Sequence, residues 1–198
     1  SLPLTYWGMA LGENWFRVPE SIRVEFSGTM PQYVSGKDLI LWLIGQIGVD
    51  GARYKALEFG GEAIDALSIE GRMTIANMAI EAGGKCGLFA TDAKTLEYCN
   101  RAGKYSERSW SDTMQPDQGA GYERTISCDI SRFEPQVACP HLPENTRPVS
   151  EVKNISVNQV IIGSCTNGRI EDMRAAAAVL KGRKVKKGLR CIVLPATE

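Results

Sequence analysis

The residue best placed to do chemistry is Cys165, in the run Gly-Ser-Cys-Thr-Asn-Gly at positions 163–168. This run separates an apolar strand pattern from a helix pattern, and ligands of α/β proteins bind where strands end. Free backbone N–H groups and the helix dipole favour a thiolate there, the form of cysteine that binds a metal or a cluster. A buried or merely reactive cysteine explains the same pattern. A phosphate cradle has less support, because no G-x-G-x-x-G or Walker sequence is present.

A second candidate is the polar stripe of a helix predicted over residues 70–82. Asn77 and Glu81 are four residues apart, so an α-helix places them on one face, which Glu70 and Thr74 extend. A carboxylate and an amide on one face could bind a hydroxyl group and move a proton. A solvated polar face gives the same stripe, and this alternative stays open on the residues alone.

The remaining cysteines, the histidine and the basic residues are weaker indicators of function than these two features. The six cysteines contain no Cys-x-x-Cys pair, and reduced thiols are the simpler interpretation than a disulfide framework. His141 is the single histidine, so this chain alone cannot build a multi-histidine metal site. The basic residues between positions 181 and 190 are typical of a solvated helix end. They lack the interleaved aromatic residues that stack on bases, which argues against nucleic acid as a partner.

Composition fits a globular protein without a membrane or nucleic-acid partner. The 198 residues include 23 basic and 23 acidic side chains, so no net field favours either partner. The longest apolar run, residues 39–44, is far too short to cross a bilayer. No signal-peptide pattern precedes the first elements, and we expect a cytoplasmic location.

The hydrophobic patterns predict an α/β fold with mostly parallel sheets and helices on both faces. Strands are expected at residues 22–26, 54–59, 86–90, 124–130, 157–162 and 189–194. Helices are expected at residues 2–12, 36–47, 70–82, 92–101 and 170–180. Ser35 and either Thr91 or Asp92 are candidate N-caps, while Gly83 and Gly103 follow helix ends. Residues 103–123 resemble a surface loop, and the proline-rich residues 135–148 an extended connector between domains.

Three segments carry a resemblance to a known family. Residues 160–177, VIIGSCTNGRIEDMRAAA, resemble the signature of 3-isopropylmalate dehydratase large subunits, a branch of the aconitase superfamily. The Gly-Ser-Cys-Thr-Asn core is common to the superfamily, and the Gly-Arg-Ile-Glu-Asp extension favours the isopropylmalate branch. Residues 15–21, WFRVPES, and residues 67–83, LSIEGRMTIANMAIEAG, agree with the same branch. The resemblance is collinear over nearly the whole chain.

The resemblance implies an iron–sulfur hydro-lyase that isomerises 2-isopropylmalate and 3-isopropylmalate by dehydration and rehydration in leucine biosynthesis. Cys165 matches one of three thiolates that hold a [4Fe–4S] cluster, whose fourth iron binds the substrate. Asn77 and Glu81 match catalytic positions that line the site, with the glutamate near the iron-bound water or hydroxyl. An open iron acting as a Lewis acid suits this elimination.

The resemblance also implies an internal fragment. The other two cluster cysteines form a Cys-x-x-Cys beyond residue 198, and serine and histidine motifs precede residue 1. A small swivelling subunit is the expected partner. We therefore expect residues 1–20 to be the tail of a first domain, 21–148 a second α/β domain with its connector, and 149–198 the start of a third. Alone, the chain is expected to be inactive and to lack the cluster.

Other activities remain open at this point. Residues 137–143, VACPHLP, differ from the Val-Thr-Trp-Gly version common in bacterial isopropylmalate enzymes. The substrate is therefore given only as a hydroxy di- or tricarboxylic acid, with homoaconitase and dimethylmalate-type dehydratase as alternatives. A non-catalytic or RNA-binding aconitase-like domain is an alternative of another class, against which the neutral charge and the absent stacking aromatics argue.

Overall fold

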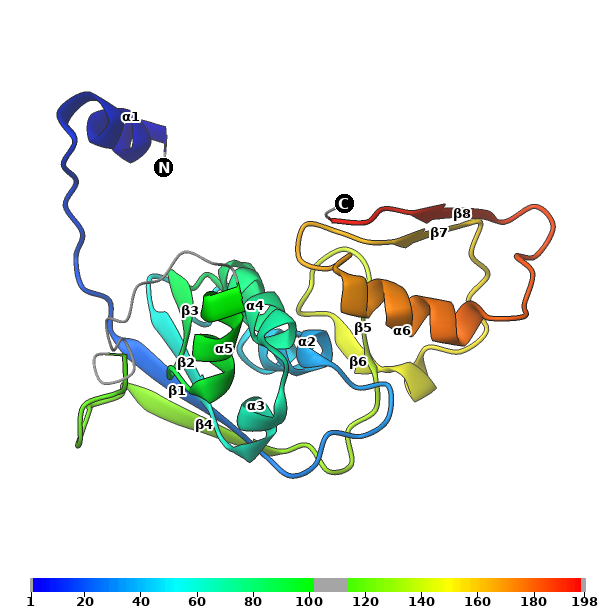
Figure 1. Cartoon of the computed structure of the whole chain (residues 1–198), viewed down its shortest axis with the longest axis horizontal. Helices are drawn as coiled ribbons and strands as arrows, with labels where there is room; N and C mark the ends of the chain where they lie inside the picture. The colour runs from blue at the N-terminus through cyan, green and yellow to red at the C-terminus, as the bar shows by residue number, and fades with distance from the viewer. Residues whose placement is uncertain (1, 102–113, 197–198) are drawn as a thin grey trace.

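The computed structural model describes residues 2–101 and 114–196 of the chain. Its largest sheet is fully parallel, with strand order β3-β2-β1-β4 (Figure 1). The strands are β1 (Ser21–Ser27), β2 (Ala56–Gly60), β3 (Cys86–Phe89) and β4 (Arg124–Asp129). Parallel neighbours need crossover connections, and helices supply them here. The predicted α/β class with a parallel sheet flanked by helices is confirmed.

The core forms between one face of this sheet and helix α2 (Gly36–Ile47). Alternate residues of β1 are fully buried, as are four apolar residues of α2. These residues are Ile22, Val24, Phe26, Leu39, Ile40, Leu43 and Ile44. Burying each such side chain contributes about 1.5–3 kcal/mol, which is what holds α2 on the sheet. Ser35 precedes α2 as predicted, and its N–H and hydroxyl both donate to the Asp38 carboxylate.

The opposite face of β1 is polar. Arg23 pairs with Glu58 on the neighbouring strand at 2.5 Å and with Glu25 at 3.3 Å. The hydroxyl of Tyr122 donates to the same Glu58 carboxylate at 2.7 Å. Helices on both faces were expected, and over β1 that expectation is wrong within residues 2–101 and 114–196, where ion pairs rather than an apolar helix satisfy this face.

The helix predicted over residues 70–82 is divided in two. Helix α4 (Ile69–Asn77) is capped by Ser68, whose hydroxyl accepts from the Gly71 N–H, and the turn η1 (Met78–Ala82) is a 3₁₀ helix. The change has a tertiary cause. The tighter turn offers the Ala82 carbonyl to the Ala52 N–H at 2.8 Å, and Gly83, at φ 80°, ends the turn as predicted.

Smaller differences have local reasons. Strand β2 begins at Ala56 rather than residue 54, because Tyr54 has φ 60° and belongs to a turn. The short helix α3 (Glu62–Ala66) was not predicted. Asp92 is confirmed as the cap of α5 (Ala93–Arg101), since its carboxylate accepts from the Thr95 N–H at 2.9 Å. Gly103 and residues 104–113 of the predicted loop lie outside the described residues.

The proline-rich segment is folded rather than extended. Strands β5 (Gln136–Ala138) and β6 (Thr146–Pro148) pair as an antiparallel hairpin, followed by the 3₁₀ turn η3 (Val149–Glu151). The hairpin packs on α2, and the Gln136 N–H donates to Asp38 at 2.7 Å. The prolines occupy the turn and strand ends, where a missing N–H costs little.

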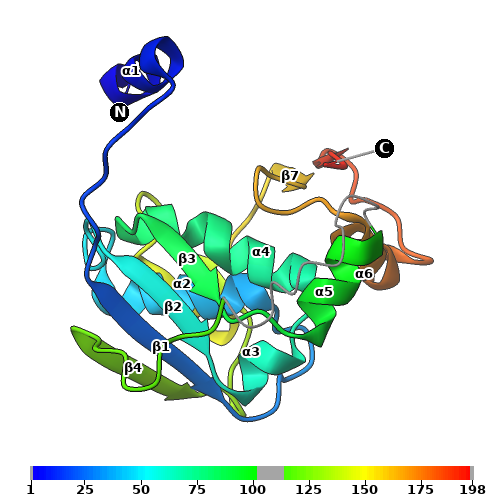
Figure 2. The same cartoon turned by 60° about the vertical axis from the view of Figure 1, so that its left-hand side comes forward.

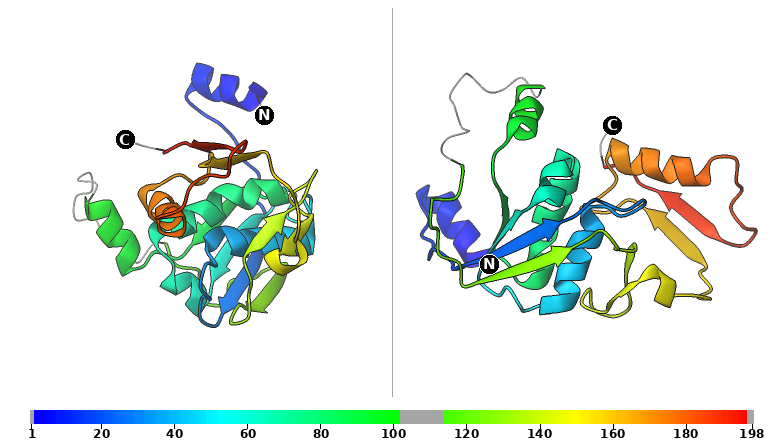
Figure 3. Two further views of the ribbon diagram at one scale, coloured as in Figure 1. Left: turned by 90° about the vertical axis from the view of Figure 1, so that its right-hand side faces the viewer. Right: turned by 90° about the horizontal axis from the view of Figure 1, so that it is seen from below.

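A second parallel pair follows, β7 (Gln159–Ile162) and β8 (Arg190–Val193), joined through helix α6 (Ile170–Leu180). Figure 3 shows this unit beside the larger sheet and its helices. Helix α1 (Leu2–Leu11) is held away from the rest of the chain on an extended segment (Figure 2). No helix of the described residues is long and apolar enough to cross a membrane.

Candidate functional site

The loop between β7 and α6 is a compact turn built around Ser164. The Ser164 hydroxyl accepts from the N–H groups of Thr166 and Asn167 at 3.3 and 3.1 Å, and the Ser164 N–H donates to the Asn167 carbonyl at 2.8 Å. These bonds turn the Thr166 side chain inward, to 6% exposure, and leave Cys165 exposed. The turn therefore presents its thiol outward.

Glycines at both ends of the loop make this turn possible. Gly163 and Gly168 have φ values of 118° and 120°, which side chains other than hydrogen rarely tolerate. A Cβ on Gly163 would clash with the Leu194 carbonyl, and one on Gly168 would lie 2.9 Å from the same oxygen. The expected need for a tight turn and close backbone approach is confirmed at both positions.

Asp172 fixes the loop to the start of α6. One of its carboxylate oxygens accepts from the N–H groups of Gly168 and Arg169 at 2.8 and 3.0 Å, and the other accepts from the Asn167 side-chain amide at 3.0 Å. A carboxylate in the first helical turn is also favoured by the helix dipole. Sequence analysis did not single out Asp172, although an acidic residue in the first turn of a predicted helix was a usable signal.

The loop and the first turn of α6 dock on helix α4. The Asn167 amide donates to the Thr74 hydroxyl at 3.3 Å, and the Arg169 guanidinium donates to the Glu70 carbonyl at 3.4 Å. The Ser68 hydroxyl donates to Glu171 at 3.1 Å. The two features that the sequence suggested separately, the Cys165 loop and the polar stripe of α4, are thus in direct contact.

Asn77 and Glu81 lie further along the same helix. Asn77 is the last residue of α4 and is exposed, three residues beyond Thr74. Glu81 lies in η1, where a 3₁₀ turn advances each residue by about 120°, so the spacing of four does not stack it on Asn77 as expected. Its Oε2 atom is buried without a hydrogen-bond partner among the described residues. Buried oxygens are rarely left without a hydrogen bond, so Glu81 Oε2 is a candidate to bond with a group outside the described residues.

The other cysteines differ from Cys165. All six are free, and Cys165 alone is exposed. Burial raises the pKa of the Cys86 and Cys128 thiols, which keeps them protonated and poorly suited to bind metal. Among residues 2–101 and 114–196, no three His, Cys, Asp or Glu side chains gather where they could hold a metal ion.

Sequence comparison with known proteins shows the family of this chain. The profile of the Aconitase family (aconitate hydratase) matches residues 7–154 and 147–198. The chain belongs to the aconitase family. It is 66% identical to the 3-isopropylmalate dehydratase large subunit of Nitratidesulfovibrio vulgaris, 64% to that of Oleidesulfovibrio alaskensis and 56% to that of Heliobacterium modesticaldum. Each alignment covers 96% of this chain and 44% of the relative, so this aconitase-family chain spans less than half of their length.

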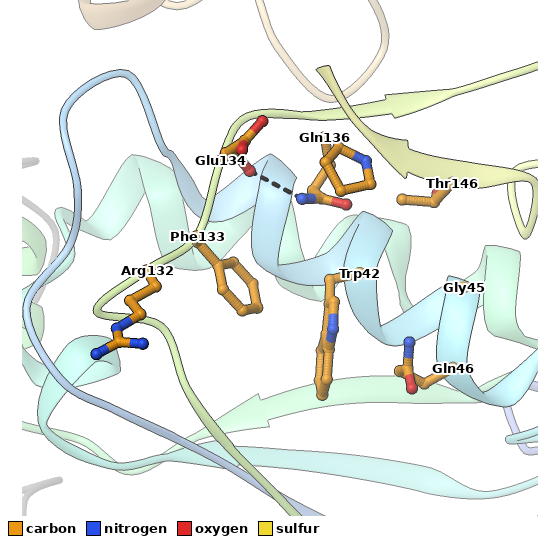
Figure 4. Close-up of a pocket in the computed structure, with 9 residues that line it drawn as sticks. Trp42, Gly45, Gln46, Arg132, Phe133, Glu134, Gln136 and Thr146 are labelled. Atoms are coloured by element: carbon orange, nitrogen blue, oxygen red, sulfur yellow. Dashed lines mark hydrogen bonds between the residues drawn. The ribbon is translucent and has the colours of Figure 1, made fainter. Parts of the chain in front are cut away.

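A cavity of about 350 Å³ lies elsewhere in this aconitase-family chain (Figure 4). It is formed between α2 and the segment leading into the hairpin, over the paired rings of Trp42 and Phe133, whose centroids are 5.7 Å apart. None of Asn77, Glu81 and Cys165 lines it. The cavity is therefore separate from the candidate site.

Proposed function

We propose that this chain is part of the large subunit of a 3-isopropylmalate dehydratase, which interconverts 2-isopropylmalate and 3-isopropylmalate. One observation carries the proposal. The exposed thiol of Cys165 is on a loop bonded to α4, the helix that ends at Asn77 and leads into Glu81 with its unpaired carboxylate oxygen. Relatives of that name share 54–66% of their residues with it over this region.

The residues present fit a [4Fe–4S] cluster held in part by this chain. Cys165 is exposed, lies in the loop that precedes α6, and offers the soft sulfur that iron–sulfur clusters require. It would supply one thiolate, and the family resemblance implies that the complete enzyme supplies two more. When bound, the cluster supplies an iron that acts as a Lewis acid on the substrate hydroxyl.

The chain's own side chains would orient that hydroxyl and move its proton. The Asn77 amide, exposed at the end of α4, can donate to or accept from a substrate oxygen. The unpaired Glu81 Oε2 can hold the proton that must reach the leaving hydroxyl oxygen, so that the C–O bond breaks and water departs. The alkene diacid forms as the adjacent carbon loses its proton to a base of the complete active site. Addition of water across the same double bond at the other carbon completes the isomerisation.

The proposal includes the arrangement of the whole enzyme. A small subunit is the partner, a hydroxy acid the substrate, and the cytoplasm the location. Residues 1–20, 21–148 and 149–198 are proposed as parts of three domains. Packing of the hairpin β5–β6 on α2 supports its assignment to the second of them. The unusual residues 137–143 form part of this hairpin, whose turn is closed by the Cys139 N–H and the Asn145 carbonyl at 2.9 Å.

The test uses the complete large subunit, purified anaerobically with its small subunit. Cys165→Ser replaces a soft thiolate by a hard hydroxyl, so iron and sulfide per polypeptide should fall sharply, and interconversion of the two isopropylmalates with them. Cys139→Ser, in the hairpin, is the matched control and should keep both. The 198-residue chain reconstituted alone should hold no stable cluster.

Full cluster content in the Cys165→Ser enzyme would show that Cys165 is not a cluster ligand. A wild-type enzyme that dehydrates homocitrate-like or dimethylmalate-like acids in preference to isopropylmalate would instead correct the substrate and keep the reaction class.

A further inference from the structure

The contact between the Cys165 loop and α4 depends on few atoms. Thr74 is 3% exposed and is the α4 side chain that reaches the loop. Its hydroxyl has one hydrogen, shared between the Glu70 carbonyl at 3.1 Å and the Thr166 carbonyl at 3.5 Å. The bond that it accepts from the Asn167 amide is therefore the main side-chain link between loop and helix.

The Asn167 side chain makes three hydrogen bonds in the same arrangement. Its side-chain NH₂ donates one hydrogen to Thr74 and the other to Asp172, at 3.3 and 3.0 Å. Its side-chain oxygen accepts from the Thr166 hydroxyl at 3.3 Å. One amide thus connects helix α4, the loop and the first turn of α6. Three of the four hydrogen-bonding capacities of the amide are thus used, which favours one orientation of the side chain.

We propose that Thr74 and Asn167 are positioning residues, whose hydrogen bond sets where the Cys165 thiol lies relative to Asn77 and Glu81. The catalytic meaning of that geometry rests on the proposed function, whereas the bond itself does not. Positioning matters in such a site, because a displacement of about 1 Å can cost roughly 100-fold in rate. Neither residue needs to touch the substrate for this role.

The test compares variants of the complete large subunit. Thr74→Val keeps the volume and removes the hydroxyl, Thr74→Ser keeps the hydroxyl, and Thr125→Val, on the exposed strand β4, is the matched control. Hydrogen exchange of residues 163–169 is measured on cluster-free protein, and kcat and KM, per cluster, on the reconstituted enzyme with its small subunit.

Thr74→Val should speed exchange of the loop by about fivefold, the loss expected for one hydrogen bond. It should lower kcat per cluster more than it raises KM. Thr74→Ser should restore both, and Thr125→Val should change neither. Wild-type loop exchange in Thr74→Val, or no recovery in Thr74→Ser, would overturn the proposal.

A double-mutant cycle with Asn167→Ala separates a direct bond from two independent roles. If the bond is direct, adding Thr74→Val to Asn167→Ala should change loop exchange little further. Multiplying effects would contradict it. If Thr74→Val does not fold, Asn167→Ala alone decides the question: it should speed exchange of the loop, and wild-type loop exchange in that variant would overturn the proposal. A wild-type enzyme without cluster or activity would refute the proposed function, while the exchange results would still decide whether these residues position the loop.

Discussion

Arg72 carries its positive charge almost entirely inside the protein. Its side chain is 5% exposed, and its Nη2 donates to the Asp92 carboxylate at 2.6 Å. This bond, with smaller contributions from the Thr95 N–H and hydroxyl, lowers the pKa of Asp92 to about 2. A lowered pKa means that the charged carboxylate stabilises the fold above pH 3.8, and that this stability is lost as pH falls through about 2.

Asp92→Asn tests this pair, since asparagine still caps α5 and removes only the charge. Arg72 would then lack its anionic partner in a buried place. We expect the free energy of unfolding at neutral pH to fall by about 1.5–3 kcal/mol, the range for a hydrogen bond to a charged group, and to lie at the lower end because Asp92 is partly exposed. Urea unfolding measures it, and the exposed Asp117→Asn is the control. If Asp92→Asn were as stable as Asp117→Asn, the ion pair between Arg72 and Asp92 would contribute no more to stability than solvation of the two groups.

At the scale of elements, the contact between α6 and α4 includes a carboxylate with a perturbed pKa. Burial raises the pKa of Glu171 above 4.5, with further increases from the charges of Glu70 and Asp172, while the Ser68 hydrogen bond and the Arg169 charge oppose the rise. The docked state therefore prefers protonated Glu171. This contribution to docking is complete below pH 4.5 and is lost as pH rises through the raised pKa.

Glu171→Gln should remove that pH dependence while keeping an acceptor for the Ser68 hydroxyl. Protection factors for residues 163–169 correct for intrinsic exchange and can be followed from pH 4.5 to neutrality. In the wild type they should fall over this interval, and in Glu171→Gln they should stay level and be higher at neutral pH. The exposed Glu151→Gln should behave as wild type. A wild-type profile in Glu171→Gln would mean that another group controls docking.

Local patterns predicted most of the elements but not their contacts. Alternation along β1 and the Ser35 cap of α2 are encoded by neighbouring residues, and both agree with the structure. The 3₁₀ turn at Met78–Ala82 is not encoded by neighbouring residues, because it depends on the hydrogen bond from the Ala52 N–H, far away in sequence. The hairpin was missed for a similar reason: its prolines suggested extension, while packing on α2 decides its fold.

The candidate site was predicted in parts. The sequence singled out Cys165, Asn77 and Glu81, but periodicity cannot show that Asn167 bonds to Thr74, 93 residues earlier. It also cannot show that a glutamate oxygen is buried and unpaired, because burial of one atom depends on the packing around it. The resemblance supplied roles for these residues, and the structure supplied their supporting contacts.

At the scale of the whole molecule, this chain belongs to the aconitase family and aligns with only part of each relative. Its alignments cover 44% of its relatives, and the arm before β1 carries exposed apolar side chains, including Trp7, Trp15, Phe16 and Val18. Catalysis by the proposed mechanism requires the remaining thiolates and the small subunit. Measurements of function therefore belong to the complete enzyme.

The most direct test is the turnover rate per cluster of Glu81→Gln in the complete enzyme. Glutamine keeps the shape of Glu81 and deletes its charge and its capacity to carry a proton. Because Glu81 is not proposed as a cluster ligand, iron per polypeptide should stay at the wild-type level. Turnover per cluster should fall by about 10²–10⁴-fold, the usual cost of losing a general acid–base group. Wild-type turnover per cluster, or loss of iron as complete as in Cys165→Ser, would contradict the assignment of Glu81 to the proton-transfer step.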